Sequence, residues 1–171
     1  MWYVIQVRTG KEEQVRDHCR KLIIEREDSA LRTARVYYYD RQMKRQGEWK
    51  SEKRVMFPGY VFLESDDVKT LFLQLKRVIG MTRLLGADNE PVPLTAKEAA
   101  LLEQLGSGTE SVDYSEGIIV GDKVQVYSGP LKGLEGMICK IDRHKRLAWI
   151  ELDFLGEKRR MELGLGVVRR E

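Results

Sequence analysis

Positively charged side chains gather at two places near the C-terminal end of this 171-residue chain. The first group is Arg143-His144-Lys145-Arg146, the second is Lys158-Arg159-Arg160, and Arg169 with Arg170 adds a basic end. Lys and Arg side chains at this density are typical of surfaces that contact phosphate groups, so the pattern indicates binding to a nucleic-acid backbone. A solvated cationic surface is the alternative.

The charge balance of the chain places its surplus on the same region. The whole chain has 30 Lys and Arg, 27 Asp and Glu, and a formal net charge of +3. Residues 118–171 hold eleven basic and eight acidic residues, whereas residues 1–117 hold nineteen of each. The entire excess of positive charge therefore lies in the C-terminal third.

The cysteines and histidines are the other candidates for chemistry. Cys19, Cys139, His18 and His144 lie in separate segments, without the spacing of a metal site or of a catalytic triad. We therefore expect no metal, no cofactor and no catalytic residue, and so a protein that is not an enzyme. Reduced thiols, the absence of a signal peptide and the absence of a membrane-spanning apolar run predict a cytoplasmic location with no membrane contact.

A short apolar strand organises the N-terminal region. The turn residues Pro58-Gly59 open into Tyr60-Val61-Phe62-Leu63, a composition that is typical of a buried strand. Alternation places Tyr60 and Phe62 on one face, with Val61 and Leu63 on the other. Both faces are apolar, so the second face is either covered as well or kept for a partner.

The other N-terminal elements follow from periodicity and from capping residues. Before the central strand we expect a strand at 2–8, a helix at 11–26 with a Thr9/Glu12 capping box, and a strand at 34–39. A basic hairpin at 40–54, which turns at Gln46-Gly47, follows. After the central strand we expect a helix capped by Ser65 or Asp66, a short strand at 81–85, and a helix that ends at Leu105 with a Thr95/Glu98 capping box. This order predicts an α+β sandwich with a ferredoxin or RNA-recognition-motif layout. For the hairpin, a solvated surface and contact with a polyanion are both open.

The last third of the chain has a different pattern. Residues 106–117 are rich in Ser, Gly and acidic side chains and contain no basic residue, which predicts a flexible acidic linker. Beyond them we expect five short strands in a small β-barrel, at 124–127, 136–141, 147–152, 159–163 and 166–168. The predicted domains are therefore 1–105 and 118–171.

The central strand has one rival interpretation. Gly59-Tyr60-Val61-Phe62-Leu63 partly matches the aromatic strand of an RNA-recognition motif, in which aromatic rings stack on bases. Pro58 and Val61 depart from that motif, which has a basic residue and a small residue at these places. A polymerase-independent RNA-binding protein is the corresponding hypothesis.

A resemblance to the NusG family of transcription elongation factors covers nearly the whole chain. Trp2-Tyr3-Val4, Phe57-Pro58-Gly59-Tyr60-Val61 and Pro91-Val92-Pro93-Leu94 resemble the family's N-terminal (NGN) domain. Residues 120–124, 128–136 and 154–157 resemble its C-terminal KOW domain, a five-stranded SH3-like barrel. The resemblance implies a monomer whose N-terminal domain binds the clamp helices of the largest RNA polymerase subunit. The docking residues would be Tyr60, Phe62, Leu84 and Val92.

Within that family the chain is most similar to LoaP, a specialised paralogue that suppresses pausing and termination in its target operons. The basic turn after Ile141 and the run from Phe154 to Arg160 carry this likeness. It implies that the KOW domain binds a nascent RNA hairpin through the basic residues named above. The alternative is a housekeeping NusG whose KOW domain recruits Rho or a ribosomal protein. Contact with the non-template DNA strand is a further implication, although Arg77-Val78 stand where housekeeping members often have Asn-Thr.

Overall fold

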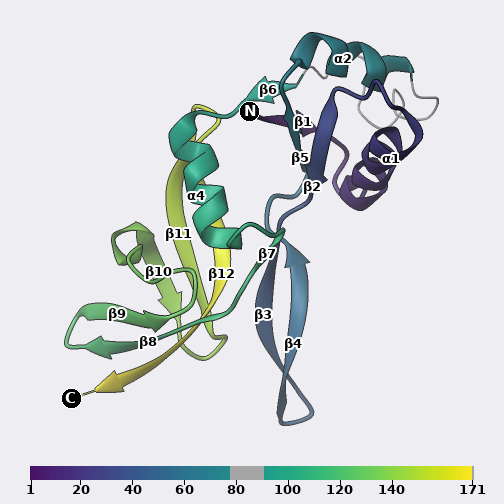
Figure 1. Cartoon of the computed structure of the whole chain (residues 1–171). Helices are drawn as coiled ribbons and strands as arrows, with labels where there is room; N and C mark the ends of the chain where they lie inside the picture. The colour runs from purple at the N-terminus through teal and green to yellow at the C-terminus, as the bar shows by residue number, and fades with distance from the viewer. Residues whose placement is uncertain (78–90, 171) are drawn as a thin grey trace. The chain divides into compact units, whose positions relative to one another are not determined.

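The structure, a computed structural model, describes residues 1–77 and 91–170. The chain divides into two compact units that do not follow its order (Figure 1). Unit 1 consists of Met1–Val36 and Phe57–Ala99, and unit 2 consists of Tyr37–Met56 and Ala100–Glu171. The hairpin that lies early in the sequence therefore belongs to the same unit as the C-terminal strands. The predicted α+β class is confirmed.

The described residues of unit 1 contain a four-stranded sheet and, wholly within the unit, the helices α1 and α2. Its elements are β1 (Trp2–Gln6), α1 (Glu12–Glu25), β2 (Leu31–Arg35), β5 (Tyr60–Ser65), α2 (Val68–Arg77) and β6 (Val92–Pro93). The strand order is β2-β5-β1-β6 and every neighbouring pair is antiparallel. Helix α1 packs against β2 and β5. The strand predicted to be central is thus an inner strand of the sheet.

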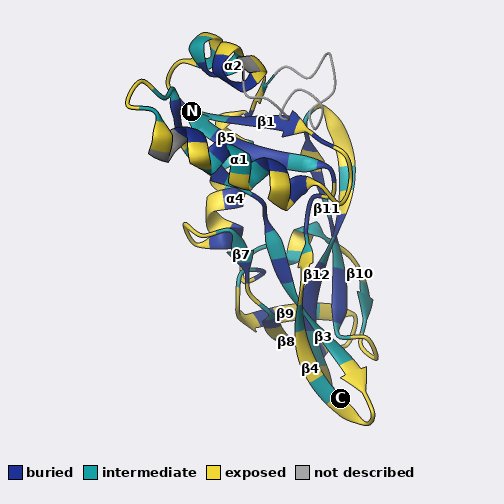
Figure 2. Ribbon diagram, turned by 90° about the vertical axis from the view of Figure 1, so that its right-hand side faces the viewer, coloured by how far each residue is buried: buried dark blue, intermediate teal, exposed yellow. Residues whose placement is uncertain are grey.

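Burial on β5 is more complete than its alternation suggested (Figure 2). Val61, Phe62 and Leu63 are all buried, and Tyr60 is half-buried. Phe62 packs edge-on against Phe57, with ring centroids 5.3 Å apart. Both faces of the strand are covered at its centre, so any exposed apolar patch must lie towards its ends or on neighbouring strands.

The start of α1 corrects the predicted capping box. The cap position is Lys11 rather than Thr9, and no side chain caps the helix. The Glu12 carboxylate instead accepts hydrogen bonds from Gly10 N–H at 2.9 Å and from Gly59 N–H at 2.8 Å. Glu12 is only 4% exposed. A tertiary donor has therefore joined the local one, because the turn before β5 brings the Gly59 N–H to this carboxylate.

The other predicted cap in unit 1 also differs. Asp67 rather than Ser65 or Asp66 caps α2, since its carboxylate accepts a hydrogen bond from Thr70 N–H at 3.1 Å. Ser65 Oγ supports this turn by accepting from Asp67 N–H at 3.1 Å. The predicted strand at 81–85 lies outside the described residues. Within the described parts of the chain, no helix is long and apolar enough to cross a membrane.

Unit 2 contains a three-stranded sheet built on the hairpin. Strands β3 (Tyr38–Arg45), β4 (Glu48–Val55) and β7 (Ser111–Val112) lie in the order β4-β3-β7. The hairpin turn at Gln46-Gly47 is confirmed, and both residues have positive φ, as a tight hairpin turn requires. The strand predicted at 34–39 is wrong as a single element, because its residues divide between β2 and β3.

The C-terminal part of unit 2 is a five-stranded sheet. It consists of β8 (Ser115–Val120), β9 (Lys123–Ser128), β10 (Ile138–Asp142), β11 (Leu147–Phe154) and β12 (Glu157–Arg170), in the order β10-β11-β12-β8-β9, with a 3₁₀ turn at Glu135–Met137. The two last predicted strands are one long strand, β12, which pairs antiparallel with β11 and then parallel with β8.

The segment predicted as a linker carries structure at both ends. Helix α4 (Ala96–Gly106) precedes it, with the predicted Thr95/Glu98 capping box in place: Glu98 N–H donates to Thr95 Oγ1 at 3.1 Å and Thr95 N–H to Glu98 Oε1 at 2.9 Å. Strand β7 lies inside the segment, Val112 is buried, and β8 begins at Ser115. The division into domains 1–105 and 118–171 stays a prediction.

Candidate functional site

The first basic cluster occupies the turn between β10 and β11. Arg143, His144 and Lys145 are exposed there. The Asp142 carboxylate accepts a hydrogen bond from Lys145 N–H at 3.0 Å, and this bond lowers the pKa of Asp142. A side chain that closes its own turn leaves the cations pointing away from it. The sequence therefore folds this turn locally and presents its positive charge to solvent.

Arg146 ends this turn and is held differently from its neighbours. Its φ is +54°, and its backbone carbonyl accepts a hydrogen bond from Leu165 N–H at 3.0 Å. Its guanidinium lies 3.9 Å from the centroid of the Trp49 ring, which is part of β4. A cation over an indole face is attracted by about 0.5 to 2 kcal/mol, depending on solvation. Arg146 thus joins the turn to the hairpin.

The second basic cluster lies among acidic residues. Strand register places Lys158 opposite Asp153 and Arg160 opposite Glu151. The Arg160 side chain lies 3.5 Å from the Glu151 carboxylate, and Arg159 lies 3.3 Å from that of Glu157. Cross-strand pairs of opposite charge cancel each other's field at a distance. These cations are visible in the sequence, but strand pairing places carboxylates beside them that offset their charge.

The structure does not bring the predicted basic residues together. The turn at 143–146 and the start of β12 lie at opposite ends of β11 (Figure 1), whose eight residues span about 25 Å at the usual rise of a strand. Arg169 and Arg170 lie at the far end of β12, where they pair with Ile119 and Val120 of β8. The nine predicted residues therefore form three separate positions on one sheet.

A close backbone contact at Gly164 and a partly buried ion pair fix the hairpin against β12, and Gly166 packs on Tyr114. A Cβ at Gly164 would overlap the Asp40 carbonyl oxygen, and one at Gly166 would overlap the Tyr114 hydroxyl. Beside them, the Tyr39 hydroxyl donates to Glu162, and Arg41 Nη1 lies 3.6 Å from the same carboxylate. Burial, and then the bond to Glu162, raise the pKa of Tyr39. The hairpin is therefore locked onto the sheet by backbone contact and by charge.

Sequence reasoning missed Trp49 and Tyr114 as parts of this arrangement. Trp49 is an aromatic residue in a polar, basic strand, and this was the available signal. Tyr114 lies next to the two β12 glycines, and burial raises its pKa while the nearby charge of Arg146 opposes that shift. Nothing local in the sequence indicates that either ring would meet residues of the C-terminal sheet.

The predicted apolar docking residues lie on unit 1. Register pairs Val4 with Phe62 on one side and with Val92 on the other, so these side chains form one row on one face of the sheet. Tyr60 lies on the same face two residues before Phe62. Val92 is 49% exposed, whereas Phe62 is 0% exposed and contributes from beneath the surface. Leu84 lies outside the described residues.

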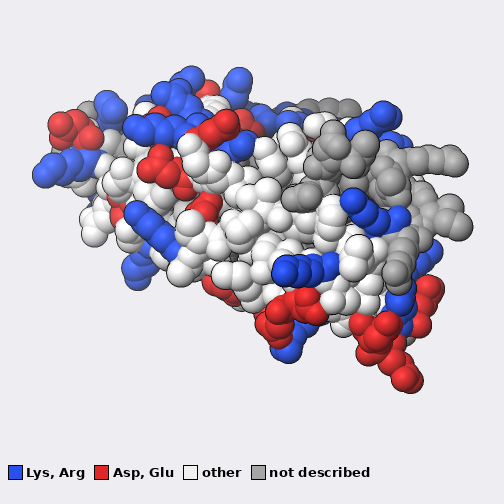
Figure 3. Space-filling view, turned by 90° about the horizontal axis from the view of Figure 1, so that it is seen from above, with Lys and Arg blue, Asp and Glu red and all other residues white. Residues whose placement is uncertain are grey.

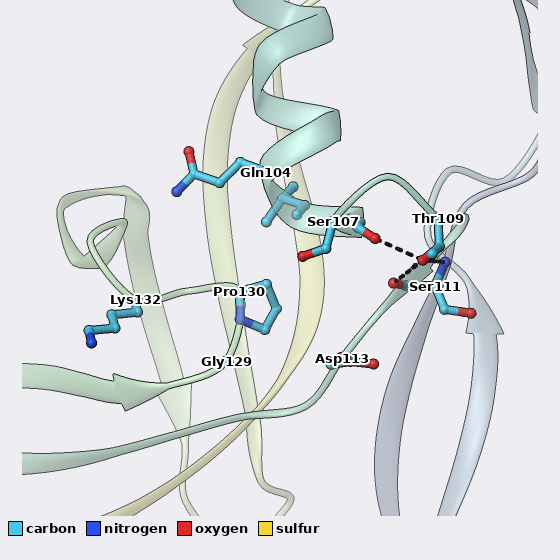
Figure 4. Close-up of a pocket in the computed structure, with 10 residues that line it drawn as sticks. Gln104, Ser107, Thr109, Ser111, Asp113, Gly129, Pro130 and Lys132 are labelled. Carbon is cyan, nitrogen blue, oxygen red and sulfur yellow. Dashed lines mark hydrogen bonds between the residues drawn. The ribbon is translucent and has the colours of Figure 1, made fainter.

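A polar cavity of about 480 Å³ is present in unit 2 (Figure 4). It lies between the end of α4 and the turn Gly129–Lys132, and its lining holds one acid, Asp113, and one base, Lys132. The Thr109 hydroxyl donates to Gly106 O at 2.7 Å and accepts from Ser111 N–H at 3.2 Å. The Thr109 hydroxyl is thus engaged with the backbone of its own loop, the Ser111 hydroxyl accepts from Lys53 Nζ at 3.0 Å, and the lining lacks a nucleophile paired with a base.

The cysteines do not form a reactive site. Cys19 is buried, which raises the pKa of its thiol to about 12. Cys139 is exposed, and its thiol donates to Trp149 O at 3.3 Å. Among residues 1–77 and 91–170, no three His, Cys, Asp or Glu side chains are grouped so as to hold a metal ion.

The global field of the molecule is weak, so local arrangement must decide where a polyanion binds. On the face shown in Figure 3, basic and acidic side chains are interspersed around a broad uncharged area. The net charge is only +3. A surface with a single acidic neighbour, such as the turn at 143–145 beside Asp142, is therefore distinguished by its surroundings rather than by its content of cations.

Comparison with known proteins gives a consistent result. Residues 1–103 match the NusG family model, described as "Transcription termination factor nusG". The Transcription termination/antitermination protein NusG of Vibrio cholerae is 27% identical over 174 residues, which cover 99% of this chain and 94% of that protein. The protein of the same name from Halalkalibacterium halodurans is 28% identical over 171 residues, which cover 95% of this chain and 93% of that protein.

A solved structure, "Domain interaction in Thermotoga maritima NusG", has the same fold. The TM-score is 0.54 at 21% sequence identity, and the match covers 95% of this chain and 92% of that one. This likeness supports an α/β N-terminal part followed by a strand-rich C-terminal part.

Proposed function

The chain belongs to the NusG family of transcription factors, which are not enzymes, and we propose that it regulates elongation by binding RNA polymerase and nascent RNA at once. Unit 1 binds the clamp helices of the largest polymerase subunit. The C-terminal sheet binds a structured RNA, and the protein then suppresses pausing and termination. The family match over residues 1–103 is the observation that carries the polymerase assignment.

The polymerase surface of this proposal is the apolar row on unit 1. Tyr60 and Val92 are its accessible members, and Val4 and Phe62 support them from within the sheet. An amphipathic helix binds such a surface by inserting apolar side chains beside an aromatic anchor. A protein held on the polymerase in this way needs no catalytic group.

The RNA surface of this proposal is the turn at 143–146. Its three exposed side chains lie beside a single acid, and the pKa of that acid is lowered by a bond within the turn. Arg differs from Lys in that its planar guanidinium can grip a guanine edge or a phosphate with two donors. An RNA helix is read through its backbone and shape, and sequence is read at loops and bulges. These properties favour a hairpin as the ligand.

A housekeeping role is the second candidate function. Both bacterial relatives carry the general NusG name, and they support this role as well as they support a specialised LoaP-like factor. The C-terminal sheet also exposes Val120, Tyr127 and Val168, three apolar side chains that would suit a protein partner such as Rho or a ribosomal protein. The likeness to LoaP stays part of the proposal.

Transcription through a terminator tests the proposal. Purified polymerase would transcribe templates with and without a candidate leader, in the presence and absence of the protein. We expect the protein to increase readthrough on the template that carries the leader and not on the template that lacks it. Tyr60→Ala with Val92→Ala should abolish the effect, because truncated anchor side chains commonly cost more than about 2 kcal/mol in binding.

Leu73→Ala is the matched control, since Leu73 is 54% exposed on α2, outside the proposed surface. Phe62 is unsuitable for this test, because its truncation would leave a cavity in the core. A Tyr60/Val92 double variant that is folded and still binds polymerase normally would reject the docking surface. Readthrough that is equal with and without the leader would favour the housekeeping role.

A further inference from the structure

The hairpin and the basic turn meet at one contact inside unit 2. Arg146 lies over Trp49, and Trp49 pairs with Lys44 across the hairpin. Cross-strand partners share a face, so Lys44 lies on the face of the hairpin that meets the turn. Residues a hundred positions apart in the sequence therefore contribute to one continuous surface.

The hairpin brings free positive charge to that surface. Lys44 and Lys50 are exposed, and neither forms an ion pair with any residue in the described part of the chain. Arg45 and Arg54 differ, because both lie 3.9 Å from the Glu52 carboxylate. Both lysines are available to an outside anion, but Lys50 pairs with Met43 and lies on the opposite face, so Lys44 is the one beside the turn.

The relative positions of the two elements are fixed. Asp40 contacts Gly164 through its backbone, and Tyr39 and Arg41 both contact the carboxylate of Glu162. Ordering of the cations before binding reduces the entropy lost when they contact a partner. Arg146 is also pre-oriented, because stacking on Trp49 immobilises the plane of its guanidinium.

We propose that Lys44 of the hairpin and Arg143, Lys145 and Arg146 of the turn form one composite site for the phosphate backbone of an RNA stem. The inference rests on the proposed function, to which it adds a second element of the RNA site. Cations from two elements can contact both strands beside a groove of a duplex, which a single turn cannot span. A stem is therefore preferred to a single strand.

Binding of the full-length protein to a labelled RNA stem-loop of about 16 base pairs tests this site. The variant is Lys44→Ala. Each lost phosphate contact lowers the slope of log K against log salt by about 0.9, so the loss of one contact weakens binding about fivefold at 0.15 M salt. The matched control is Lys50→Ala, which removes the same charge from the opposite face of the same hairpin. We expect the control to bind within about twofold of the unaltered protein, since Lys50 does not face the turn.

A variant that changes no charge separates geometry from electrostatics. Trp49→Ala removes the ring beneath Arg146 and should weaken binding about fivefold while the salt slope stays nearly unchanged, because a cation–π contact contributes about 1 kcal/mol. Circular dichroism would confirm that each variant is folded. Binding of the same proteins to a duplex DNA of equal length is also measured. We expect it to be weaker than binding to RNA and less affected by the lysine changes.

The outcomes distinguish this inference from the proposed function. If Arg143→Ala with Lys145→Ala abolishes RNA binding but the Lys44 variant binds normally, the composite site is rejected and the RNA-binding function stands. If the unaltered protein binds no RNA, both are rejected. If the Lys44 variant loses RNA and DNA binding equally, the assignment to RNA is rejected.

Discussion

The two ends of the β11–β12 hairpin have the same kind of sequence but different surroundings. At one end, Arg143, His144 and Lys145 are exposed beside one acid, and Arg146 contacts Trp49. At the other end, Lys158, Arg159 and Arg160 alternate with carboxylates across and along the strands. The first end is joined to the hairpin of unit 2, and the second carries its own neutralising charge. A count of cations cannot tell these ends apart.

Strand register explains the difference. Two of the acids that neutralise the second cluster, Glu151 and Asp153, lie on β11, and a shift of one residue would move them to the other face of the sheet. The residues of the β10–β11 turn have no such cross-strand acids, and their one acidic neighbour is Asp142. Electrostatic function in a β-protein therefore depends on pairing as much as on composition.

The largest difference between the two ends should appear in RNA binding. Arg143→Ala, Lys145→Ala and Arg146→Ala together should weaken binding to a labelled stem-loop about 100-fold at 0.15 M salt, because three phosphate contacts are lost. Lys158→Ala, Arg159→Ala and Arg160→Ala remove the same charge and should weaken binding less than about threefold, since these cations already have partners. Equal losses in the two triple variants would remove the distinction between the ends.

A smaller difference is expected in stability. Gly164→Ala should lower the free energy of unfolding by about 2 kcal/mol, because its Cβ would overlap the Asp40 carbonyl oxygen and separate the hairpin from β12. Gly156→Ala at the other end has open space but a φ of +77°, and should lower it by about 1 kcal/mol. Denaturant unfolding measures both values, and hydrogen exchange should show loss of protection in β3 and β4 for Gly164→Ala alone. Unchanged protection in β3 would contradict the locking role of this glycine.

Neutralising the acids should make the second end resemble the first. Glu151→Gln with Asp153→Asn leaves Arg160 and Lys158 without opposing charge. We expect RNA affinity to rise about fivefold and the salt slope to steepen, since freed cations can contact phosphates. Glu64→Gln with Asp66→Asn on unit 1 is the charge-matched control and should have less effect. No gain in the first variant would mean that the second end cannot reach an RNA.

The smallest effect concerns the pH dependence of stability at the joined end. The pKa of Tyr39 is raised in the folded protein by burial and by its bond to Glu162. This contribution to stability is fully present below the pKa of an unfolded tyrosine, about 10, and is lost as pH rises above that value towards the folded pKa. Tyr39→Phe removes the titration, so its melting temperature should fall less than that of the unaltered protein between pH 9 and about 11. If the melting temperatures of the two proteins fell in parallel as pH rises, Tyr39 would not titrate at this contact.

Local signals predicted the parts of the fold that local interactions determine. The Thr95/Glu98 capping box and the Gln46-Gly47 turn are both confirmed, because each involves residues adjacent in the chain. Thr9/Glu12 has the same signal and failed, since Gly59 supplies a better donor from 47 positions away. The absence of helical periodicity beyond residue 118 correctly indicated strands, although β8 was missed and β12 was divided.

For the candidate site too, only the parts that local sequence determines were predictable. The basic turn at 143–146 and the apolar strand at Tyr60 are visible in the sequence. The neutralisation of Lys158 by Asp153 requires the register of two strands, and the contact of Arg146 with Trp49 requires the tertiary fold. The complete burial of Phe62 was also hidden, because alternation describes one strand and not what covers it.

The composition of unit 2 from two distant segments has a consequence for synthesis on the ribosome. Residues 37–56 emerge more than a hundred residues before Glu162 and Gly164, against which the hairpin packs. At a translation rate of about 5 to 20 residues per second, the hairpin must wait roughly 5 to 20 seconds for its partner strand. Its exposed lysines would oppose edge-to-edge association of nascent chains during that time. A charged hairpin tip thus also protects the chain before folding is complete.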